Sequence, residues 1–381
     1  MNLNSNVKEL NFLDEIDRIE EEYKSNKKGL ITNVSDWNPS KEFKTSVADF
    51  LANNFPVDSI DYIFSYSQSE QRKEKVLNRL GCPLNKAILF THSGSASILN
   101  CVNMLYASGV KKLIILCPAY FTLFHVCKIY NIECIPVYLK KDKNGFYIES
   151  DSLIRMTDKN IAFWVTNPVY CTSVYYDKKM IGLFKMMLEN NIVVFDESLC
   201  FSSLELSHIL SYSQNFIGIY SPHKSVCING NKFSAIVTDE KRQKFLDAWS
   251  DVLCGCLSTG NHIAISHFLS ENFSKYNEAF LQNILINKNI TQELCDKYNV
   301  SYDKDSYGYL ITVYFQHIAS NKGLDINFIK TVMENTGIRF ISGKRNHFGD
   351  NLGFCFRINL AAYNDQFRVA IERSFDYLSQ Y

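Results

Sequence analysis

The strongest candidate for chemistry in this chain is a lysine that follows an apolar segment. Lys224 comes shortly after residues 216–220 and lies in the sequence Ser-Pro-His-Lys-Ser. Lysine is almost never fully buried without a partner, so its position at the end of a core strand is unusual. A desolvated lysine near other cationic groups has a lowered pKa and can act as an amine nucleophile that forms a Schiff base. The alternative is a surface lysine whose ammonium group reaches water.

Three other polar segments also follow apolar runs. Residues 91–97, Thr-His-Ser-Gly-Ser-Ala-Ser, precede a helical pattern, and the amides at a helix N-terminus favour an anion. Their spacing is not Gly-x-Gly-x-x-Gly, so a dinucleotide is not indicated. Asp196 and Glu197 follow residues 192–195, and buried carboxylates are costly unless they meet a cation. Residues 166–173 contain a turn at Asn167-Pro168, and each of these segments alone also fits an ordinary cap or turn.

The scaffold that must bring these segments together is visible as an alternation of apolar runs and helical patterns from about residue 45. The expected strands are Ala87–Phe90, Leu113–Cys117, Cys134–Val137, Ile161–Val165, Ile192–Phe195, Phe216–Tyr220 and Ser234–Val237. Continuous apolar strands separated by helices predict an α/β fold whose mostly parallel sheet is covered by helices on both faces. Ligands of such folds bind beyond the carboxyl ends of the strands, where the polar segments lie.

The pattern changes after about residue 240. Residues 241–298 are expected to be almost all helical, and the remainder predicts a smaller α+β domain. Its expected elements are strands at 309–315, 338–341 and 354–359 and helices at 326–335 and 365–379. We therefore expect an N-terminal helix and arm at residues 1–44 that packs with the small domain, a large domain at 45–270 and a small domain at 271–381.

Composition limits the classes of partner. Lys and Arg number 40, as do Asp and Glu, and a formal net charge of zero lacks the basic surplus that nucleic acids or anionic membranes attract. The N-terminus shows no secretory signal, and no apolar stretch approaches the ~18 residues of a membrane span. The 12 cysteines include no Cys-x-x-Cys pair and lie mostly in apolar runs. We expect a cytoplasmic protein with reduced thiols and no metal site.

In sequence order, six motifs of this chain resemble those of the fold-type I pyridoxal-phosphate enzymes, and within them the class I/II aminotransferases. The family's Asn-Pro-x-Asn-Pro-Thr-Gly corresponds here to Asn-Pro-Val-Tyr-Cys-Thr-Ser at residues 167–173. The six matching segments are Gly94–Ala96, Pro118–Tyr120, Asn167–Ser173, Asp196–Leu199, Ser221–Lys224 with Gly230–Ser234, and Phe356–Asn359. The resemblance covers roughly residues 30–360, which is most of the chain.

This resemblance implies pyridoxal 5'-phosphate as the cofactor. Lys224 would hold it as a Schiff base and then shuttle a proton as general acid and base. Asp196 would pair with the pyridine nitrogen, Tyr120 would stack on the ring, and Arg357 would bind the substrate carboxylate with its planar fork. The remaining implied cofactor contacts are Gly94, Ser95, Ala96, Asn167, Tyr170, Ser221 and Lys232, with Asn167 also at the substrate. Tyr66 would reach the phosphate of the partner subunit in a homodimer.

Three departures separate this chain from the family pattern. Tyr170 replaces the second Asn of the Asn-Pro motif, Leu199 replaces the family Tyr, and Lys232 replaces the Arg that holds the phosphate. The resemblance implies transfer of an amino group between an amino acid and a 2-oxo acid. The departures favour an unusual amino acid in a specialised biosynthetic pathway. The alternatives are a lyase, decarboxylase or oxidase that uses the same cofactor, and a binding module that keeps the fold without turnover.

Overall fold

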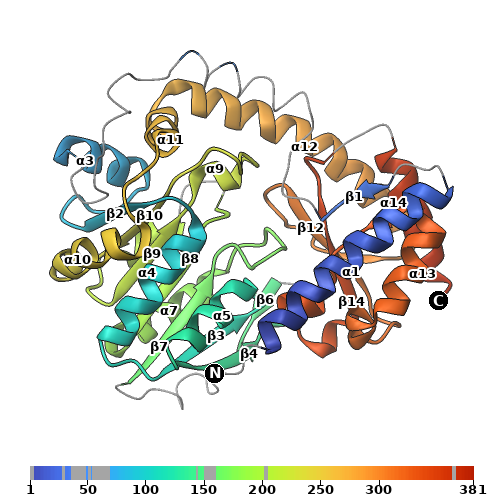
Figure 1. The fold of residues 1–381 in the computed structure, drawn as a ribbon, viewed down its shortest axis with the longest axis horizontal. Helices are drawn as coiled ribbons and strands as arrows, with labels where there is room; N and C mark the ends of the chain where they lie inside the picture. Colours follow the sequence, from blue (N-terminus) through green and yellow to red (C-terminus); the bar gives the residue numbers. More distant parts are fainter. Residues whose placement is uncertain are drawn as a thin grey trace.

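The computed structural model describes residues 4–27, 31–35, 49, 53, 69–142, 145–149, 160–200, 205–362 and 366–381. Within this part of the chain, the larger unit is built on a seven-stranded sheet with the order β2-β10-β9-β8-β7-β3-β4 (Figure 1). The strands are β2 (Ala87–Thr91), β3 (Lys112–Cys117), β4 (Glu133–Tyr138), β7 (Ile161–Thr166), β8 (Ile192–Glu197), β9 (Phe216–Tyr220) and β10 (Ser234–Thr238). Each strand predicted for this unit is present.

The sheet is mostly parallel, which confirms the predicted fold class. The neighbouring pairs β4–β3, β3–β7, β7–β8 and β8–β9 are parallel. Strand β10 runs antiparallel to both β9 and β2. Where helices cover a strand on both faces, its successive residues enter two different apolar layers. Val193 and Phe195 of β8 belong to one buried cluster, and Val194 belongs to the other.

Helices cover both faces of this sheet (Figure 1). Those that pack on the strands are α4 (Gly94–Ala107), α5 (Phe121–Ile129), α7 (Lys178–Asn190) and α10 (Gln243–Cys254). The larger unit also contains α3 (Glu70–Arg79), α8 (Glu205–Leu210) and α9 (Pro222–Ser225). Several begin at side chains that satisfy the first amides of the helix. Ser93 caps α4 by accepting from the Ala96 amide at 3.3 Å, and Asp177 caps α7 by accepting from the Met180 amide at 2.8 Å.

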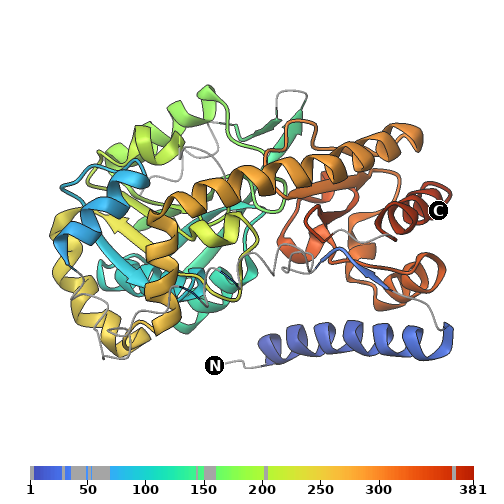
Figure 2. The same cartoon turned by 90° about the horizontal axis from the view of Figure 1, so that it is seen from above.

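The smaller unit contains a three-stranded antiparallel sheet of β11 (Ser301–Tyr302), β12 (Leu310–Phe315) and β14 (Phe354–Asn359). Helices α13 (Ile326–Thr336) and α14 (Phe367–Ser379) pack beside it. Helix α11 (Thr259–Leu269) lies against the larger unit, and α12 (Glu271–Lys297) continues from it across to the smaller unit (Figures 1 and 2). Among the described residues, no helix is both long and apolar enough to cross a membrane.

The N-terminal segment is attached to the smaller unit. Helix α1 (Asn4–Lys27) lies along it in Figure 2, and β1 (Thr32–Asn33) pairs in parallel with β13 (Ile338–Arg339). Arg339 forms ion pairs with Asp17 and Glu20 of α1. The strand pairing fixes the position of the residues that follow β1, which the site uses.

The turn after β7 contains two non-glycine residues in the left-handed backbone region. Cys171 has a φ of 68° and Ser173 a φ of 55°. Only glycine adopts this region without a steric penalty from Cβ. Ser173 stands where the family motif has glycine, the residue that adopts this left-handed conformation most readily.

We predict that Ser173→Gly is neutral or raises the free energy of unfolding by up to about 1 kcal/mol, because loss of Cβ strain outweighs the added freedom of the unfolded chain. Thr172→Gly is the matched control. Its hydroxyl donates to the Val169 carbonyl at 2.8 Å, so its loss should cost about 1–3 kcal/mol. Urea denaturation measures both changes, and equal losses in the two variants would contradict the argument.

Candidate active site

The carboxyl ends of β3, β8 and β9 bring Lys224, Tyr120 and Asp196 together. Lys224 lies in α9, one turn after β9, and its Nζ is 5.2 Å from the centre of the Tyr120 ring. Tyr120 follows β3, and Asp196 lies at the end of β8. The two charged residues are close enough for the Asp196 carboxylate to influence the pKa of Lys224. Segments far apart in sequence therefore meet at one edge of the sheet, as the strand pattern predicts.

The protein environment favours the neutral amine of Lys224. Desolvation lowers the pKa of Lys224, and the positive charge of Arg357 lowers it further. The Asp196 carboxylate opposes these effects, but the pKa remains below the ordinary value for lysine. A neutral amine is the nucleophilic form of lysine, so Lys224 has the electrostatic setting that the sequence analysis predicts for it.

A small polar cradle lies beside the N-terminus of α4. A Cβ added to Gly94 would lie 3.3 Å from Ser221 Oγ and 3.4 Å from Ser198 Oγ, so a side chain here would occupy the space beside these two hydroxyls. The helix N-terminus and two hydroxyls suit an anion of phosphate size. The Ala96 amide, which the resemblance implies as a cofactor contact, donates to Ser93 Oγ and reaches an anion only if Ser93 turns away. Ser95 is exposed at this helix end.

Lys232 lies near Lys224 on the same side of the structure. Its Nζ donates to the Asn229 carbonyl at 2.5 Å. Desolvation and the charge of Lys224 both lower the pKa of Lys232. The protonated forms of the two amines repel one another, and an anion beside them would favour their protonation.

Asn261, which the sequence analysis did not identify, connects the two loops that form the cradle. Its Nδ2 donates to the Lys232 carbonyl at 2.6 Å and to the His92 carbonyl at 3.3 Å. Its Oδ1 accepts from Ser258, with which it forms a capping box at the start of α11, and lies 2.8 Å from His92 Nδ1. The Ser-x-x-Asn spacing is a helix-start signal that could have located the residue, although not its long-range partners.

Asn167 is held by a buried carboxylate. Its Nδ2 donates to Glu197 Oε1 at 2.7 Å, and the Ser207 hydroxyl donates to the other carboxylate oxygen. The Asn167 side chain is buried, and its Oδ1 has no hydrogen-bond partner within the described part of the chain. Burial raises the pKa of Glu197 to about 7. Glu197 thus fixes the orientation of the Asn167 amide, a role that its place beside Asp196 in the sequence does not reveal.

Tyr170 lies beside Tyr120. Its ring centre is 5.9 Å from that of Tyr120, and the side chain is buried. Burial raises the pKa of Tyr170, whereas the charge of Arg357 acts in the opposite direction. The replacement for the family Asn therefore lies at the site, next to the aromatic ring that the resemblance places on the cofactor.

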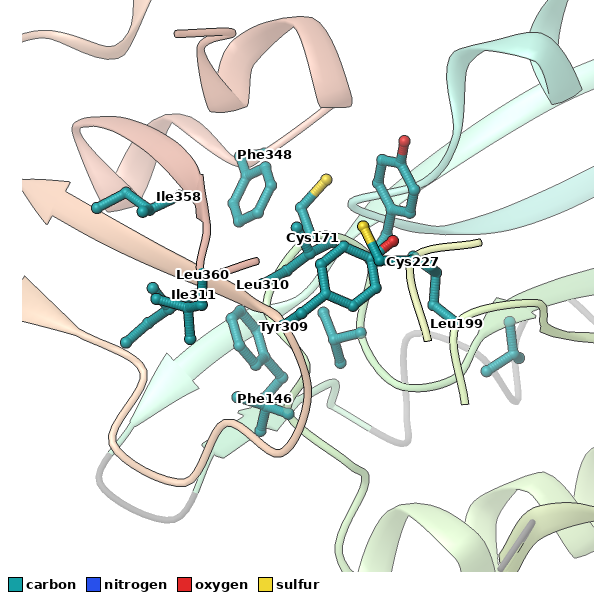
Figure 3. Packing of buried hydrophobic residues seen from close by; sticks show 14 of the residues in the cluster. Phe146, Cys171, Leu199, Cys227, Tyr309, Leu310, Ile311, Phe348, Ile358 and Leu360 are labelled. Carbon is teal, nitrogen blue, oxygen red and sulfur yellow. The ribbon is translucent and has the colours of Figure 1, made fainter. Parts of the chain in front are cut away.

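Arg357 reaches the site from β14 of the smaller unit. Its side chain is buried, its Nη2 donates to the Ser35 carbonyl at 3.0 Å, and its Nη1 donates to Cys171 Sγ at 3.4 Å. Leu199 is buried in the apolar cluster shown in Figure 3 and has no hydrogen-bonding side chain. Tyr66 lies outside the described residues, so the structure gives no position for it.

Comparison with known proteins identifies the fold. No protein-family model matches the chain, and no curated protein sequence matches it. Solved structures match nearly its whole length. An Escherichia coli protein with a methionine aminotransferase function shares 11% identity over 97% of both chains, with a TM-score of 0.76. N-Succinyldiaminopimelate aminotransferase from Mycobacterium tuberculosis shares 14% identity over 96% of both, with a TM-score of 0.77.

A third match is kynurenine aminotransferase from Pyrococcus horikoshii, with 14% identity, a TM-score of 0.77, and coverage of 95% of this chain and 94% of that one. At 11–14% identity, these similarities establish the shared architecture. The chain has the fold of the fold-type I aminotransferases, as the six motifs indicate.

The raised pKa of Glu197 predicts a pH-dependent stability. A carboxyl whose pKa is about 7 in the folded protein binds its proton more tightly than in the unfolded chain, where the ordinary value is 4.5. Its contribution to stability is therefore present at low pH and is lost as the pH rises through this window. Glu197→Gln keeps an acceptor for Asn167 but cannot ionise. Relative to this variant, the wild type should lose about 1–3 kcal/mol of unfolding free energy between pH 4.5 and 7.

Chemical denaturation across this pH range measures the difference between the two proteins. The exposed Glu278, which lines the same cavity of about 470 Å³ as Glu197, provides the control. Glu278→Gln should follow the wild-type curve. A Glu197→Gln curve parallel to the wild type would show that Glu197 does not titrate in this window.

Proposed function

We propose that this protein is a pyridoxal 5'-phosphate-dependent aminotransferase. The observation that carries the proposal is Lys224, an amine with a lowered pKa at the carboxyl ends of the sheet, placed against Tyr120 and within the field of Asp196. The fold supports the proposal, since the matched structures include a methionine aminotransferase and a kynurenine aminotransferase solved with PMP.

The residues present fit the cofactor. The cradle at Gly94 lies between the α4 N-terminus and the Ser221 and Ser198 hydroxyls, which suits the phosphate group. Lys232 would add positive charge on that side. Tyr120 offers an aromatic face, and the buried Asp196 offers a carboxylate for the pyridine nitrogen. When bound, the cofactor would act as an electron sink for negative charge that develops at the substrate's α-carbon.

The chain's own residues would perform the remaining tasks. Lys224 would link covalently to the cofactor through Nζ and then, once substrate has displaced it, hold and return the α-proton as a general base and acid. Asp196 would keep the pyridine nitrogen protonated. Arg357 would orient the amino-acid substrate by binding its carboxylate. Asn167, fixed by Glu197, and Tyr170 would contact the cofactor beside the reacting atoms.

The finer parts of the proposal rest on the departures from the family pattern. Tyr170, Leu199 and Lys232 alter groups around the cofactor, which favours an unusual amino acid in a specialised biosynthetic pathway. We propose a cytoplasmic homodimer in which the partner subunit's Tyr66 completes the phosphate site. The substrates would be an amino acid and a 2-oxo acid.

Borohydride reduction tests the role of Lys224. Protein reconstituted with pyridoxal 5'-phosphate should absorb visible light, and reduction should attach the cofactor to Lys224, as located by peptide mass spectrometry. Lys224→Ala should lose this covalent link while its thermal unfolding remains cooperative. The exposed Lys241 provides the control, and Lys241→Ala should still trap the cofactor on Lys224. Attachment to another lysine in the wild-type protein would refute the assignment.

Single-turnover product analysis with a panel of amino acids tests the reaction type. An aminotransferase should convert the amino acid to its 2-oxo acid and leave the amino group on the cofactor, in one equivalent per site. Ammonia, carbon dioxide or peroxide as the stoichiometric product would instead assign a lyase, decarboxylase or oxidase. No product from any amino acid, despite trapping at Lys224, would contradict the proposed activity.

A further inference from the structure

Four buried hydroxyl groups form a chain of hydrogen bonds beside the candidate phosphate cradle. Thr91 Oγ1 lies 2.7 Å from Ser97 Oγ, and Ser97 Oγ lies 2.9 Å from Ser234 Oγ. Ser221 Oγ, the cradle hydroxyl beside Gly94, lies 3.0 Å from the same Ser234 oxygen. All four side chains are at most 1% exposed. Because a buried hydroxyl is costly unless it is hydrogen-bonded, these contacts fix the positions of the four groups relative to one another.

Ser234 stands at the branch point of this chain, and its own proton is already in use. It lies at the start of β10 and donates to the Tyr220 carbonyl at 2.6 Å. A hydroxyl has one proton and two lone pairs, so Ser234 accepts from both Ser97 and Ser221. In this arrangement the Ser221 proton is committed to Ser234 and is not donated to an anion in the cradle. The motif of the related family has glycine at position 234, which carries no hydroxyl.

We propose that Ser234 is a positioning residue for the phosphate site and that it acts through Ser221. When an anion occupies the cradle, Ser234 turns its proton from the Tyr220 carbonyl to Ser221 Oγ, and Ser221 donates its own proton to the anion. The hydrogen bonds then run in one direction, and each hydroxyl polarises the next, so Ser221 becomes a stronger donor. This inference rests on the proposed function, which assigns the cofactor phosphate to this cradle.

The neighbouring departure at Lys232 agrees with this role. Lysine keeps the positive charge of the family arginine but lacks its planar fork, so it gives a phosphate less directional support. An oriented Ser221 hydroxyl supplies a directional donor beside the N-terminus of α4. Ser234 thus adds a polar group to the phosphate site of a chain that has lost the guanidinium.

The test compares pyridoxal 5'-phosphate with pyridoxal, which lacks the phosphate. Isothermal calorimetry on the purified full-length protein, after removal of any cofactor, gives both dissociation constants, and their ratio is the phosphate preference. Ser234→Ala should lower this preference roughly tenfold, because a hydrogen bond to a charged group is weakened, and should leave pyridoxal affinity within about twofold. Ser374 of α14 is the matched control, a buried serine that donates to the Ile371 carbonyl at 2.8 Å. Ser374→Ala should keep the phosphate preference within about twofold.

Three further variants separate positioning from a purely structural effect. Ser234→Gly removes the same hydroxyl and lowers the phosphate preference by the same factor as Ser234→Ala, although glycine destabilises a strand more. In a Ser221→Ala background, Ser234→Ala should change the preference less than twofold, because Ser234 acts through Ser221. If the Ser234 variants do not fold, Ser97→Ala keeps the test informative, since alanine is favoured in α4. It should lower the preference about threefold.

Other outcomes overturn the proposal. An unchanged phosphate preference in Ser234→Ala or in Ser97→Ala would do so, as would a full effect of Ser234→Ala in the Ser221→Ala background. A preference that falls with thermal stability, further for glycine than for alanine, would show a structural role only. A wild type that binds pyridoxal as tightly as pyridoxal 5'-phosphate would remove the phosphate from the cradle. Failure of borohydride trapping at Lys224 would refute the proposed function, and the phosphate preference would still decide whether Ser234 serves Ser221.

Discussion

The structure depends on placing cationic side chains inside the protein, at the open edge of a sheet. Removing Lys224 from water is unfavourable, and the nearby positive charge of Arg357 adds to the cost. The Asp196 carboxylate partly offsets both effects. The result is a lysine with a lowered pKa, close to the positive charge of Arg357 and to the aromatic ring of Tyr120. The apolar strands beneath keep these groups fixed, because their side chains are packed on both faces.

The two units share the site through the turn that follows β7. The Thr312 hydroxyl and the Tyr307 amide, both from the smaller unit, donate to the carbonyls of Cys171 and Ser173 at 2.8 and 2.7 Å. Arg357 approaches the same turn from β14. The turn thus receives polar contacts from the smaller unit while Asn167, at its other end, is bonded to Glu197 of the larger unit at 2.7 Å. This short segment therefore connects Arg357, which we propose binds the substrate carboxylate, to the residues that we propose contact the cofactor.

Local patterns allowed the scaffold and the main charged residues to be predicted, but long-range side-chain contacts were beyond them. Apolar runs located the strands because burial on both faces leaves a continuous signature, and strand ends then placed Lys224 and Asp196. Asn261 shows the limit. Its bond to the His92 carbonyl joins residues 169 positions apart, and nothing in either neighbourhood indicates the other. Glu197 was visible as a carboxylate, yet its partner Asn167 became apparent only when adjacent strands were aligned.

The hydrogen bond between Arg357 and the Ser35 carbonyl joins residues separated by 322 positions. This separation affects the order in which the site can form during translation. During synthesis the early residue emerges long before its partner exists. The seven-stranded sheet, whose last strand ends at Thr238, can assemble while β14 is still untranslated. Lys224 and its neighbours in the larger unit can therefore take their positions before Arg357 of β14 is translated. Under the proposed function, the residues assigned to the cofactor phosphate would be in place before the residue assigned to the substrate carboxylate is translated.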